Sequence, residues 1–358
     1  MANGLVNRIR LSEGRVIGNE ALREQLAGEI RRGTMPHAYL LEGGRGMGKH
    51  LLAKEICAAL SCQSSENGAL PCRKCRNCQK ILEDKSPDVR IIGKGERASI
   101  GVDDVRFLRS DVLIPPNDLE HRFYIIEDAQ DMTEAAQNAL LLTLEEPPSY
   151  VVFLLLTENT ANMLETIRSR APALRLCPVD DDTMEAYLTT ESKGYGAMPP
   201  AERVELLRMA AGSVGRALEL MDGRARKPLI DRRRFVARVV EHCLRTGRRD
   251  TMQSVELIGG FGNAREEISA KLALMQQAVR DLIVLKKSDG APLLFYADRE
   301  EAAALSQSAP IAVLHQTLQK MEYTRGRILR NANVRLALTE LLLCDDVPSA
   351  IIGERMDP

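Results

Sequence analysis

Four closely spaced cysteines set the strongest limit on how this chain can fold. Cys62, Cys72, Cys75 and Cys78 follow the spacing C-x9-C-x2-C-x2-C. Four thiolates at this spacing can close on one tetrahedral zinc ion, with each sulfur about 2.3 Å from the metal. The residues between the last three cysteines are polar, which argues against four unrelated thiols in an apolar core. Because four thiolates leave no position for water, the pattern predicts a structural zinc site rather than a catalytic one.

The composition bounds the class of protein and the compartment. The chain has 358 residues, enough for two or three domains, and its 49 basic and 50 acidic residues give a net charge of −1. No global field therefore attracts nucleic acid, and any DNA contact needs a local patch. The longest strongly apolar run, residues 151–156, is too short to span a bilayer, and the first residues lack a secretory signal. We expect a cytoplasmic protein with reduced cysteines and no membrane partner.

A glycine-rich segment precedes the cysteines. It reads Gly-Gly-Arg-Gly-Met-Gly-Lys-His at residues 43–50, between an apolar run and a helical pattern. Such a turn can wrap backbone N–H groups around nucleotide phosphates, with Gly43 and Gly48 allowing close approach and Lys49 reaching the terminal phosphates. His50 stands where a serine or threonine would ligate magnesium, and imidazole suits that hard cation poorly. The segment predicts a phosphate loop. Whether it binds ATP and Mg²⁺ stays open, and we expect weak hydrolysis at most. The alternative is a glycine turn that holds no ligand.

Two further apolar runs predict buried strands. The first run, residues 122–126, is followed by Glu127 and Asp128, which could hold magnesium and orient water as in other NTPases. The usual order of these acids is Asp then Glu, so two solvated carboxylates at a strand end are the alternative. A helix follows the acids, and Asp131 with Glu134 predicts its N-terminal cap. The second run, residues 151–156, precedes Thr157. Strands alternating with helices predict a mostly parallel α/β sheet over residues 1–178.

The pattern changes after residue 178. A capping signal at residues 180–183 and the helical segments after it predict a small helical domain over 179–227, with a loop near 194–200. From residue 228 to 358 the apolar spacing is almost wholly helical, which predicts an all-α C-terminal domain. The basic run within residues 224–238 could contact phosphates or an acidic partner, although such runs are commonly solvated helix faces.

Several segments together resemble one known family. They are the four cysteines and residues 16–20, 36–40, 43–50, 138–148, 166–170, 212–218 and 331–336. The chain resembles the delta-prime family of bacterial DNA polymerase III clamp-loader subunits, which belongs to the AAA+ proteins. The resemblance implies a RecA-like parallel sheet with a zinc-binding insertion at residues 62–78. It also implies that residues 179–227 form a helical lid and residues 228–358 a collar that assembles a ring-shaped pentamer.

The resemblance further implies roles for particular residues. Ser169 and Arg170 correspond to the family's arginine-finger motif, so Arg170 would complete the ATP site of a neighbouring subunit. Thr157 falls at the sensor position after the third strand. Gly215 stands where the ATP-hydrolysing gamma and tau subunits carry a sensor arginine, and Arg216 lies one residue away. The positions that the family uses for ATP hydrolysis are altered in the phosphate loop, at the two acids and at Gly215, whereas Arg170 is retained. This combination is typical of a stator, a subunit that no longer hydrolyses ATP itself.

The expected function is that of a clamp-loader subunit in DNA replication with weak or absent ATPase activity of its own. Its partners would be gamma/tau and delta subunits in a heteropentamer and, through that complex, the sliding clamp and primer–template DNA. The chain would thereby be part of a DNA polymerase holoenzyme. Two alternatives stay open. One is an active ATPase motor akin to gamma/tau, against which His50 and Gly215 argue. The other is a zinc-dependent DNA-binding protein with a relic nucleotide fold.

Overall fold

The computed structural model describes residues 16–64, 70–245, 250–288, 291, 293–296 and 298–343. The chain divides into two compact units, Met1–Met198 with Ala210–Leu218 and Pro199–Met209 with Glu219–Pro358. Both ends of the chain and residues 65–69 of the predicted zinc insertion lie outside the described residues. Among the helices that are described, none is both long enough and apolar enough to cross a membrane.

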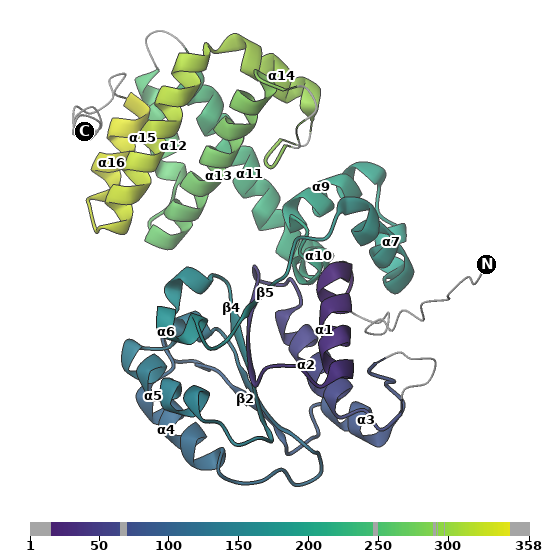
Figure 1. The fold of residues 1–358 in the computed structure, drawn as a ribbon. Coiled ribbons are helices and arrows are strands. Elements are labelled where there is room, and N and C mark those ends of the chain that lie inside the picture. Colours follow the sequence, from purple (N-terminus) through teal and green to yellow (C-terminus); the bar gives the residue numbers. More distant parts are fainter. Residues whose placement is uncertain are drawn as a thin grey trace. The chain divides into compact units, whose positions relative to one another are not determined.

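The first unit is built on a parallel five-stranded sheet with the strand order β2-β3-β4-β1-β5 (Figure 1). Its strands are β1 (Ala38–Glu42), β2 (Val89–Ile92), β3 (Arg122–Ile126), β4 (Val151–Thr157) and β5 (Ala173–Arg175). Its helices are α1 (Glu20–Arg32), α2 (Lys49–Leu60), α3 (Arg76–Leu82), α4 (Val102–Asp111), α5 (Glu134–Glu145), α6 (Glu165–Arg168), α7 (Asp181–Glu191) and α8 (Lys193–Gly196). The 3-10 turns η2 (Ala129–Asp131) and η3 (Thr160–Asn162) complete it. The predicted α/β class with a parallel sheet is confirmed.

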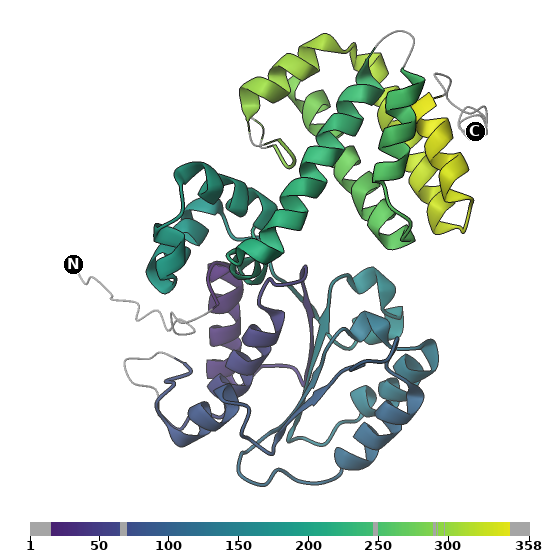
Figure 2. The ribbon, with the colours of Figure 1, turned by 180° about the vertical axis from the view of Figure 1, so that it is seen from behind.

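Helices cover both faces of this sheet, as Figure 1 and the reverse view in Figure 2 show. Successive side chains of a strand point to opposite faces. Tyr39 and Leu41 of β1 therefore pack in one core with α1, α2 and α3. Leu40 of the same strand packs in a second core with α4, α5 and α6. Strands β3 and β4 are buried along their whole length, and apart from Arg122 and Thr157 at their ends they are apolar, which is why both strands were predictable.

Two local predictions differ from the structure. Helix α5 begins with Thr133, whose hydroxyl accepts a hydrogen bond from the Ala136 N–H at 3.2 Å, and not with Asp131. The 3-10 turn η2 separates the strand from the helix, and the Asp131 carboxylate pairs with Lys94 instead. The loop predicted near 194–200 is shorter than expected, because helix α8 extends to Gly196 and the next helix begins at Pro200. The predicted cap at residue 180 is confirmed.

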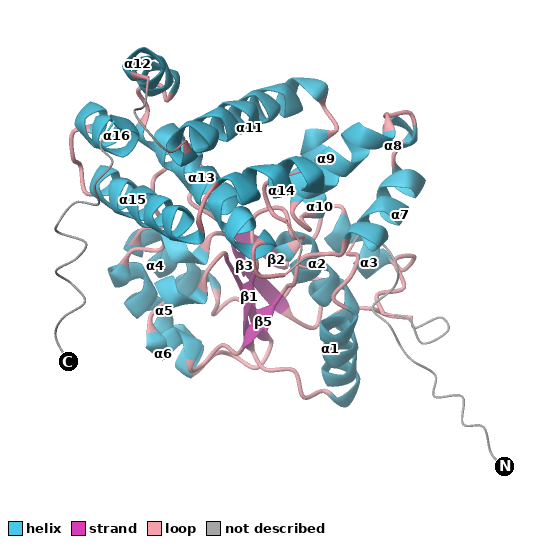
Figure 3. Cartoon of the chain, turned by 90° about the horizontal axis from the view of Figure 1, so that it is seen from above, coloured by secondary structure: helices cyan, strands magenta, loops and turns pink. Residues whose placement is uncertain are grey.

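Helices are the only regular secondary structure among the described residues of the second unit, and Figure 3 shows the strands confined to the sheet. Helix α9 (Pro200–Ala210) belongs mainly to this unit, and α10 (Val214–Leu220) mainly to the first. The remaining helices are α11 (Gly223–Leu244), α12 (Thr251–Gly260), α13 (Arg265–Leu285), α14 (Arg299–Ser308), α15 (Ile311–Leu329) and α16 (Val334–Leu343). They share one apolar core. The three predicted domains stay a prediction, and α11 runs through the position of the second boundary, between residues 227 and 228.

Candidate functional site

The candidate nucleotide site lies at the carboxyl edge of the sheet. Strand β1 ends at Glu42 and runs into the glycine-rich segment, which leads to helix α2. Strand β4 lies between β1 and β3, with Thr157 paired in register with Glu42. Glu127 and Asp128 follow the end of β3 on the other side of β4. In parallel sheets the carboxyl ends of the strands share one edge, so three separate segments of the sequence meet here.

The glycine-rich segment bonds extensively with itself. The Lys49 ammonium donates to the Gly43 carbonyl at 2.5 Å and to the Gly44 carbonyl at 3.1 Å. The Gly44 N–H points to the Met47 sulfur at 3.1 Å, and the Gly43 N–H donates to the Thr157 carbonyl at 3.1 Å. Burial lowers the pKa of Lys49, an effect opposed by the carboxylates of Glu158 and Asp128. The group expected to reach phosphates is therefore held against the loop's own carbonyls.

His50 faces the acid expected at the metal position. Its Nδ1 lies 2.8 Å from Oε1 of Glu127, although the two atoms are not joined by an aligned hydrogen bond. Both side chains are partly exposed. Magnesium prefers oxygen ligands and keeps several waters, and here a ring nitrogen sits directly against the candidate carboxylate. This contact is a specific geometric obstacle to a magnesium ion between the phosphate loop and β3.

A cavity of about 840 Å³ opens over this edge. It brings together five of the predicted residues, namely Gly48, Lys49, His50, Glu127 and Asp128. Four polar residues from loops after the strands join them and were not predicted, namely Lys94, Gln130, Asp131 and Glu158. Their position at strand ends is the signal that could have found them. Gly43, Thr157 and Arg216 are described but do not line the cavity. The Thr157 hydroxyl, fully buried, accepts a hydrogen bond from the Asn159 N–H at 3.2 Å.

The start of helix α10 lies directly on the phosphate loop. The Gly215 N–H donates to the Gly46 carbonyl at 2.9 Å, and the Ser213 hydroxyl donates to the Arg45 carbonyl at 3.0 Å. A Cβ on Gly215 would lie 2.9 Å from backbone atoms of Gly46, and Gly46 itself has a φ of 76°. The contact therefore needs glycine on both sides. Arg216, considered as a substitute sensor, has its N–H on the Ser213 hydroxyl at 3.3 Å.

Arg170 stands outside this cavity, at the end of helix α6. Its guanidinium donates to the Glu145 carboxylate at 2.6 Å, to the Thr166 carbonyl at 3.0 Å and to the Ser169 hydroxyl at 3.3 Å. About a third of the side chain, 35%, stays exposed. The Ser169 hydroxyl donates to the same Thr166 carbonyl at 3.0 Å. The arginine is thus fixed in direction while part of its surface faces outward.

The four predicted zinc ligands come together in a candidate metal centre between α2 and α3. The sulfur atoms of Cys62, Cys72, Cys75 and Cys78 all lie within 4.8 Å of one another. A tetrahedral zinc with bonds of about 2.3 Å would place its sulfurs about 3.8 Å apart, so a small contraction closes the site. The backbone N–H groups of Cys72 and Cys75 point to the sulfurs of Cys62 and Cys72 at 3.4 and 3.3 Å. Such bonds orient thiolate ligands and stabilise their charge.

The thiols of the cluster differ in how readily they lose a proton. Burial alone would raise the pKa of the Cys75 thiol, but hydrogen bonds from the backbone of Cys78 and Gln63 and from neighbouring thiols lower it to about 7. A thiol must lose its proton to bind zinc. Burial raises the pKa of Cys62 and Cys78, as it does that of Cys57 in the apolar core of α2, so a metal would have to displace the protons of Cys62 and Cys78. Cys75 is therefore the thiol of the cluster whose pKa favours loss of the proton.

An ion pair links the cluster to the helix that begins at the phosphate loop. Arg73, which follows the ligand Cys72, donates to the carboxylate of Glu55 on α2, and Glu55 is completely buried. Burial raises the pKa of Glu55 to about 7 despite the opposing charges of Arg73 and Arg23. The second carboxylate oxygen is buried without a hydrogen-bond partner in the described chain. Figure 1 shows α3 beside α2 at this end of the unit.

The sheet order, the phosphate loop and the four-cysteine insertion define the class: an AAA+ core with a candidate metal module, followed by a helical C-terminal region. Two family models match this chain. One, described as DNA polymerase III, delta subunit, matches residues 18–180, and one for the C-terminal part of the same subunit matches residues 241–344. The chain belongs to the clamp-loader subunits of DNA polymerase III, of the delta and delta-prime type.

Relatives of known name agree with this family. DNA polymerase III subunit tau of Escherichia coli is 33% identical over 208 residues, which is 58% of this chain and 32% of that protein. DNA polymerase III subunit gamma of Buchnera aphidicola is 30% identical over 209 residues, or 58% of this chain and 57% of that protein. The chain therefore matches less than two thirds of either relative. A solved gamma subunit-related protein of Thermotoga maritima aligns with a TM-score of 0.37 and 20% identity, over 92% of this chain and 99% of that one.

Proposed function

We propose that this subunit acts as a stator in the clamp loader: it does not turn over ATP itself and completes the ATP site of a neighbouring subunit. The observation that carries the first half is the contact between His50 and Glu127, with Nδ1 and Oε1 2.8 Å apart. Phosphoryl transfer depends on a metal that bridges the phosphates and neutralises the developing charge. An imidazole in the metal position, held against the acid that would coordinate the metal, supports weak or absent hydrolysis.

Arg170 supports the second half of the proposal. The guanidinium lies outside the cavity of its own subunit and is oriented by Glu145 and Thr166. An arginine supplied in trans stabilises charge on the transferring phosphoryl group, and its effect depends on accurate placement. Ser169 contributes by bonding the same guanidinium at 3.3 Å. An arginine of this kind can act in the ATP site of a neighbouring subunit even when its own subunit does not bind or hydrolyse ATP.

The four-cysteine cluster is proposed to hold structural zinc. Cys62, Cys72, Cys75 and Cys78 would supply all four ligands, which leaves no position for substrate or water. When bound, zinc would fix the insertion against α2 and add folding free energy to this unit. ATP and Mg²⁺ are not required by this role.

The proposed partners are those of the family. They are gamma/tau and delta subunits in a heteropentameric ring and, through the assembled loader, the sliding clamp and primer–template DNA. The whole assembly would act in replication as part of the DNA polymerase III holoenzyme. The role of the C-terminal helices as a collar and of residues 179–227 as a lid belongs to the same proposal.

The test is a loader reconstituted with gamma/tau and delta subunits in which Arg170→Ala replaces the native chain. Arginine fingers are worth on the order of a thousandfold in rate, so hydrolysis at the interface that Arg170 completes should nearly vanish in single-turnover experiments. Arg168→Ala is the matched control, because Arg168 is an exposed arginine on the same short helix. Assembly, followed by gel filtration, should be intact in both variants. An unchanged rate with Arg170→Ala, or an equal loss with Arg168→Ala, would refute the assignment.

A motor like gamma/tau is the second candidate, and the 33% identity to a tau subunit together with Lys49 in a cavity of about 840 Å³ favours it. This reading requires magnesium to bind despite His50. It predicts that the purified chain hydrolyses ATP without partners and loses this activity on Lys49→Ala. The stator reading predicts no hydrolysis by the isolated chain.

A further inference from the structure

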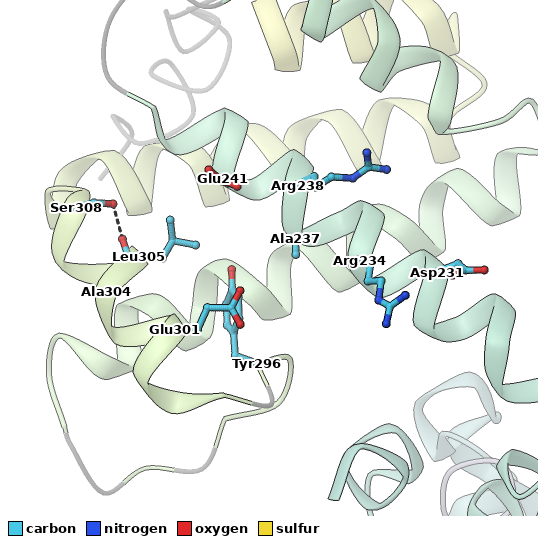
Figure 4. Close-up of a pocket in the computed structure, with 10 residues that line it drawn as sticks. All are labelled: Asp231, Arg234, Ala237, Arg238, Glu241, Tyr296, Glu301, Ala304, Leu305 and Ser308. Carbon is cyan, nitrogen blue, oxygen red and sulfur yellow. Dashed lines mark hydrogen bonds between the residues drawn. The ribbon is translucent and has the colours of Figure 1, made fainter. Parts of the chain in front are cut away.

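The second unit contains a groove that none of the roles above uses. It lies between helices α11 and α14, has a volume of about 890 Å³ and is shown in Figure 4. Its walls include the apolar residues Ala237, Ala304 and Leu305. Ligand sites commonly enclose 300–1,000 Å³ and combine such apolar walls with a few fixed polar groups. We call it the α11–α14 groove.

A tyrosine hydroxyl is buried at this groove without a partner. Tyr296 is only 5% exposed, and its hydroxyl makes no hydrogen bond to any described residue. Figure 4 shows the hydroxyl directed between the two helices. A buried hydroxyl without a partner is costly, and most such groups in folded proteins are satisfied by protein, water or ligand. A polar group from outside the described residues could therefore form a hydrogen bond with this hydroxyl.

The position of this tyrosine is fixed by its backbone. The N–H groups of Leu294, Phe295 and Tyr296 all donate to the carboxylate of Asp281, at 3.1, 2.6 and 3.3 Å. The Tyr296 carbonyl accepts a hydrogen bond from Arg208. Asp281 is fully buried on α13. These bonds fix the backbone that carries Tyr296, and the burial of the side chain limits its movement.

The charges around the hydroxyl favour a cationic group. Burial raises the pKa of Tyr296, and the carboxylates of Glu301, Asp281 and Glu241 raise it further, so the hydroxyl stays protonated and feels negative charge. Asp281 is satisfied by three N–H groups and Arg280. Glu301 has no ion pair with any residue in the described part of the chain, and Glu241 holds only Arg245 at 3.0 Å. Glu301 is thus an unpaired carboxylate of the described residues near the hydroxyl, and Glu241 is a second acid that shares its charge with Arg245.

The arginines of the groove are at its other end. Arg234 and Arg238 lie on α11, and Figure 4 shows their guanidinium groups on the side away from Tyr296 and Glu301. A single anion bound by the arginines would leave the Tyr296 hydroxyl without a partner, next to the acidic side chains. A side chain with a cationic head and an aliphatic stem matches the acidic end and the apolar walls together.

We propose that the α11–α14 groove receives a basic side chain, arginine or lysine, from a partner protein. The stem would lie along Ala237 and Leu305, and the head would bridge Glu241 and Glu301 and donate to the Tyr296 oxygen. Charge-assisted bonds of this kind are the stronger ones available to a side chain. An acidic residue near this arginine or lysine in the partner would then form an ion pair with Arg234. This site is independent of the phosphate loop and of Arg170.

The probe for the test is N-acetyl-L-arginine amide, added to the full-length chain labelled with 3-fluorotyrosine and followed by fluorine NMR. The chain has 7 tyrosines, and the signal of Tyr296 is the one missing from a Tyr296→Phe protein. We expect this signal to shift to saturation with the arginine probe and to stay fixed with N-acetyl-L-norleucine amide, which has a stem but no charge. Glu301→Gln should weaken binding about three- to tenfold through loss of a carboxylate partner.

Glu300→Gln is the matched control. Glu300 and Glu301 both occupy the first turn of α14, so each change removes the same favourable charge from that helix end, but only Glu301 lines the groove. Equal weakening in the two variants would overturn the proposal, as would the absence of a saturable shift with the arginine probe. A saturable shift caused by inorganic phosphate and lost in Arg234→Gln would replace the basic partner with an anion.

Discussion

The buried carboxylate of Glu55 depends on Arg73, and replacing this arginine by methionine tests whether the cysteine module is fastened to helix α2. Glu55 is fully buried, and burial raises its pKa from 4.5 to about 7 even with Arg73 present. Because the pKa is raised in the folded state, the contribution of Glu55 to stability is complete below pH 4.5 and is lost as the pH rises through about 7. Arg73 limits that loss by stabilising the ionised form.

The cost of losing Arg73 follows from this titration. Without the guanidinium, Glu55 would stay protonated in the folded protein even above pH 7. The stability lost by the variant therefore equals the free energy that the native protein gains above about pH 7 when Glu55 ionises. At about 1.4 kcal/mol for each pH unit, this amounts to almost nothing near pH 6, about 1 kcal/mol near pH 7.5 and about 3 kcal/mol near pH 9. Methionine keeps the packing of the long stem, so the change tests charge rather than volume.

Calorimetric melting of the zinc-loaded protein measures this effect. In a unit of this size, 1 kcal/mol shifts the melting temperature by about 2–4 °C, so Arg73→Met should melt about 6–12 °C below the native protein near pH 9. Near pH 6 the two should melt together. Arg76→Met is the matched control, because Arg76 is an exposed arginine of the same module.

Two outcomes would refute this reasoning. One is a fall in melting temperature that is equal near pH 6 and near pH 9, which would mean that Arg73 acts through contacts other than the charge of Glu55. The other is the same pH-dependent fall with Arg76→Met, which would locate the titration in the zinc site. In a Glu55→Gln background, the effect of Arg73→Met should lose its pH dependence, since no carboxylate is left to ionise.

Three further predictions concern the metal and the phosphate loop. Cys75→Ser should reduce bound zinc below one ion per chain and expose the insertion to proteolysis, because metal binding and local folding are coupled; elemental analysis showing no zinc in the intact native protein would remove the assignment. Zinc affinity should also fall as the pH drops, and because the pKa values of Cys62 and Cys78 are raised, protons should compete with the metal already above pH 7. His50→Thr should make binding of a fluorescent ATP analogue depend on Mg²⁺, since a hydroxyl would replace the imidazole at the metal position; binding that stays indifferent to Mg²⁺ would contradict the role given to His50.

The sequence predicts the middle of the sheet better than its edges. Strands β3 and β4 are buried along their whole length and are apolar except for one residue at an end of each strand. Strand β2 is an edge strand with only partial burial, and β5 has three residues of which one is buried, so neither leaves a clear pattern. An edge strand meets solvent on one side and needs few apolar side chains, which removes the signal that identifies a central strand.

The candidate site shows the same division. The phosphate loop and the cysteines are contiguous in sequence, so their spacing alone identified them. Lys94 reaches the cavity only because β2 lies next to β3, a neighbourhood that depends on the strand order. Glu55 is a single acid in an apolar helix and resembles any solvated residue until Arg73 is placed against it. Contacts between distant segments are set by the fold, and a single sequence does not encode them locally.

The phosphate loop differs from an open nucleotide site in two separable ways, and their magnitudes can be compared. The first is the contact of His50 with Glu127, which under the proposed function would deny magnesium its position and so prevent hydrolysis. The second is the contact of α10, in which Gly215 and Ser213 bond the carbonyls of Gly46 and Arg45. If a nucleotide must displace these two bonds, at about 1 kcal/mol net each, its affinity falls about 30-fold whatever residue stands at position 50. Changing His50 alone should therefore restore dependence on the metal without restoring tight binding, and tight binding by His50→Thr would show that the contact of α10 opens without cost.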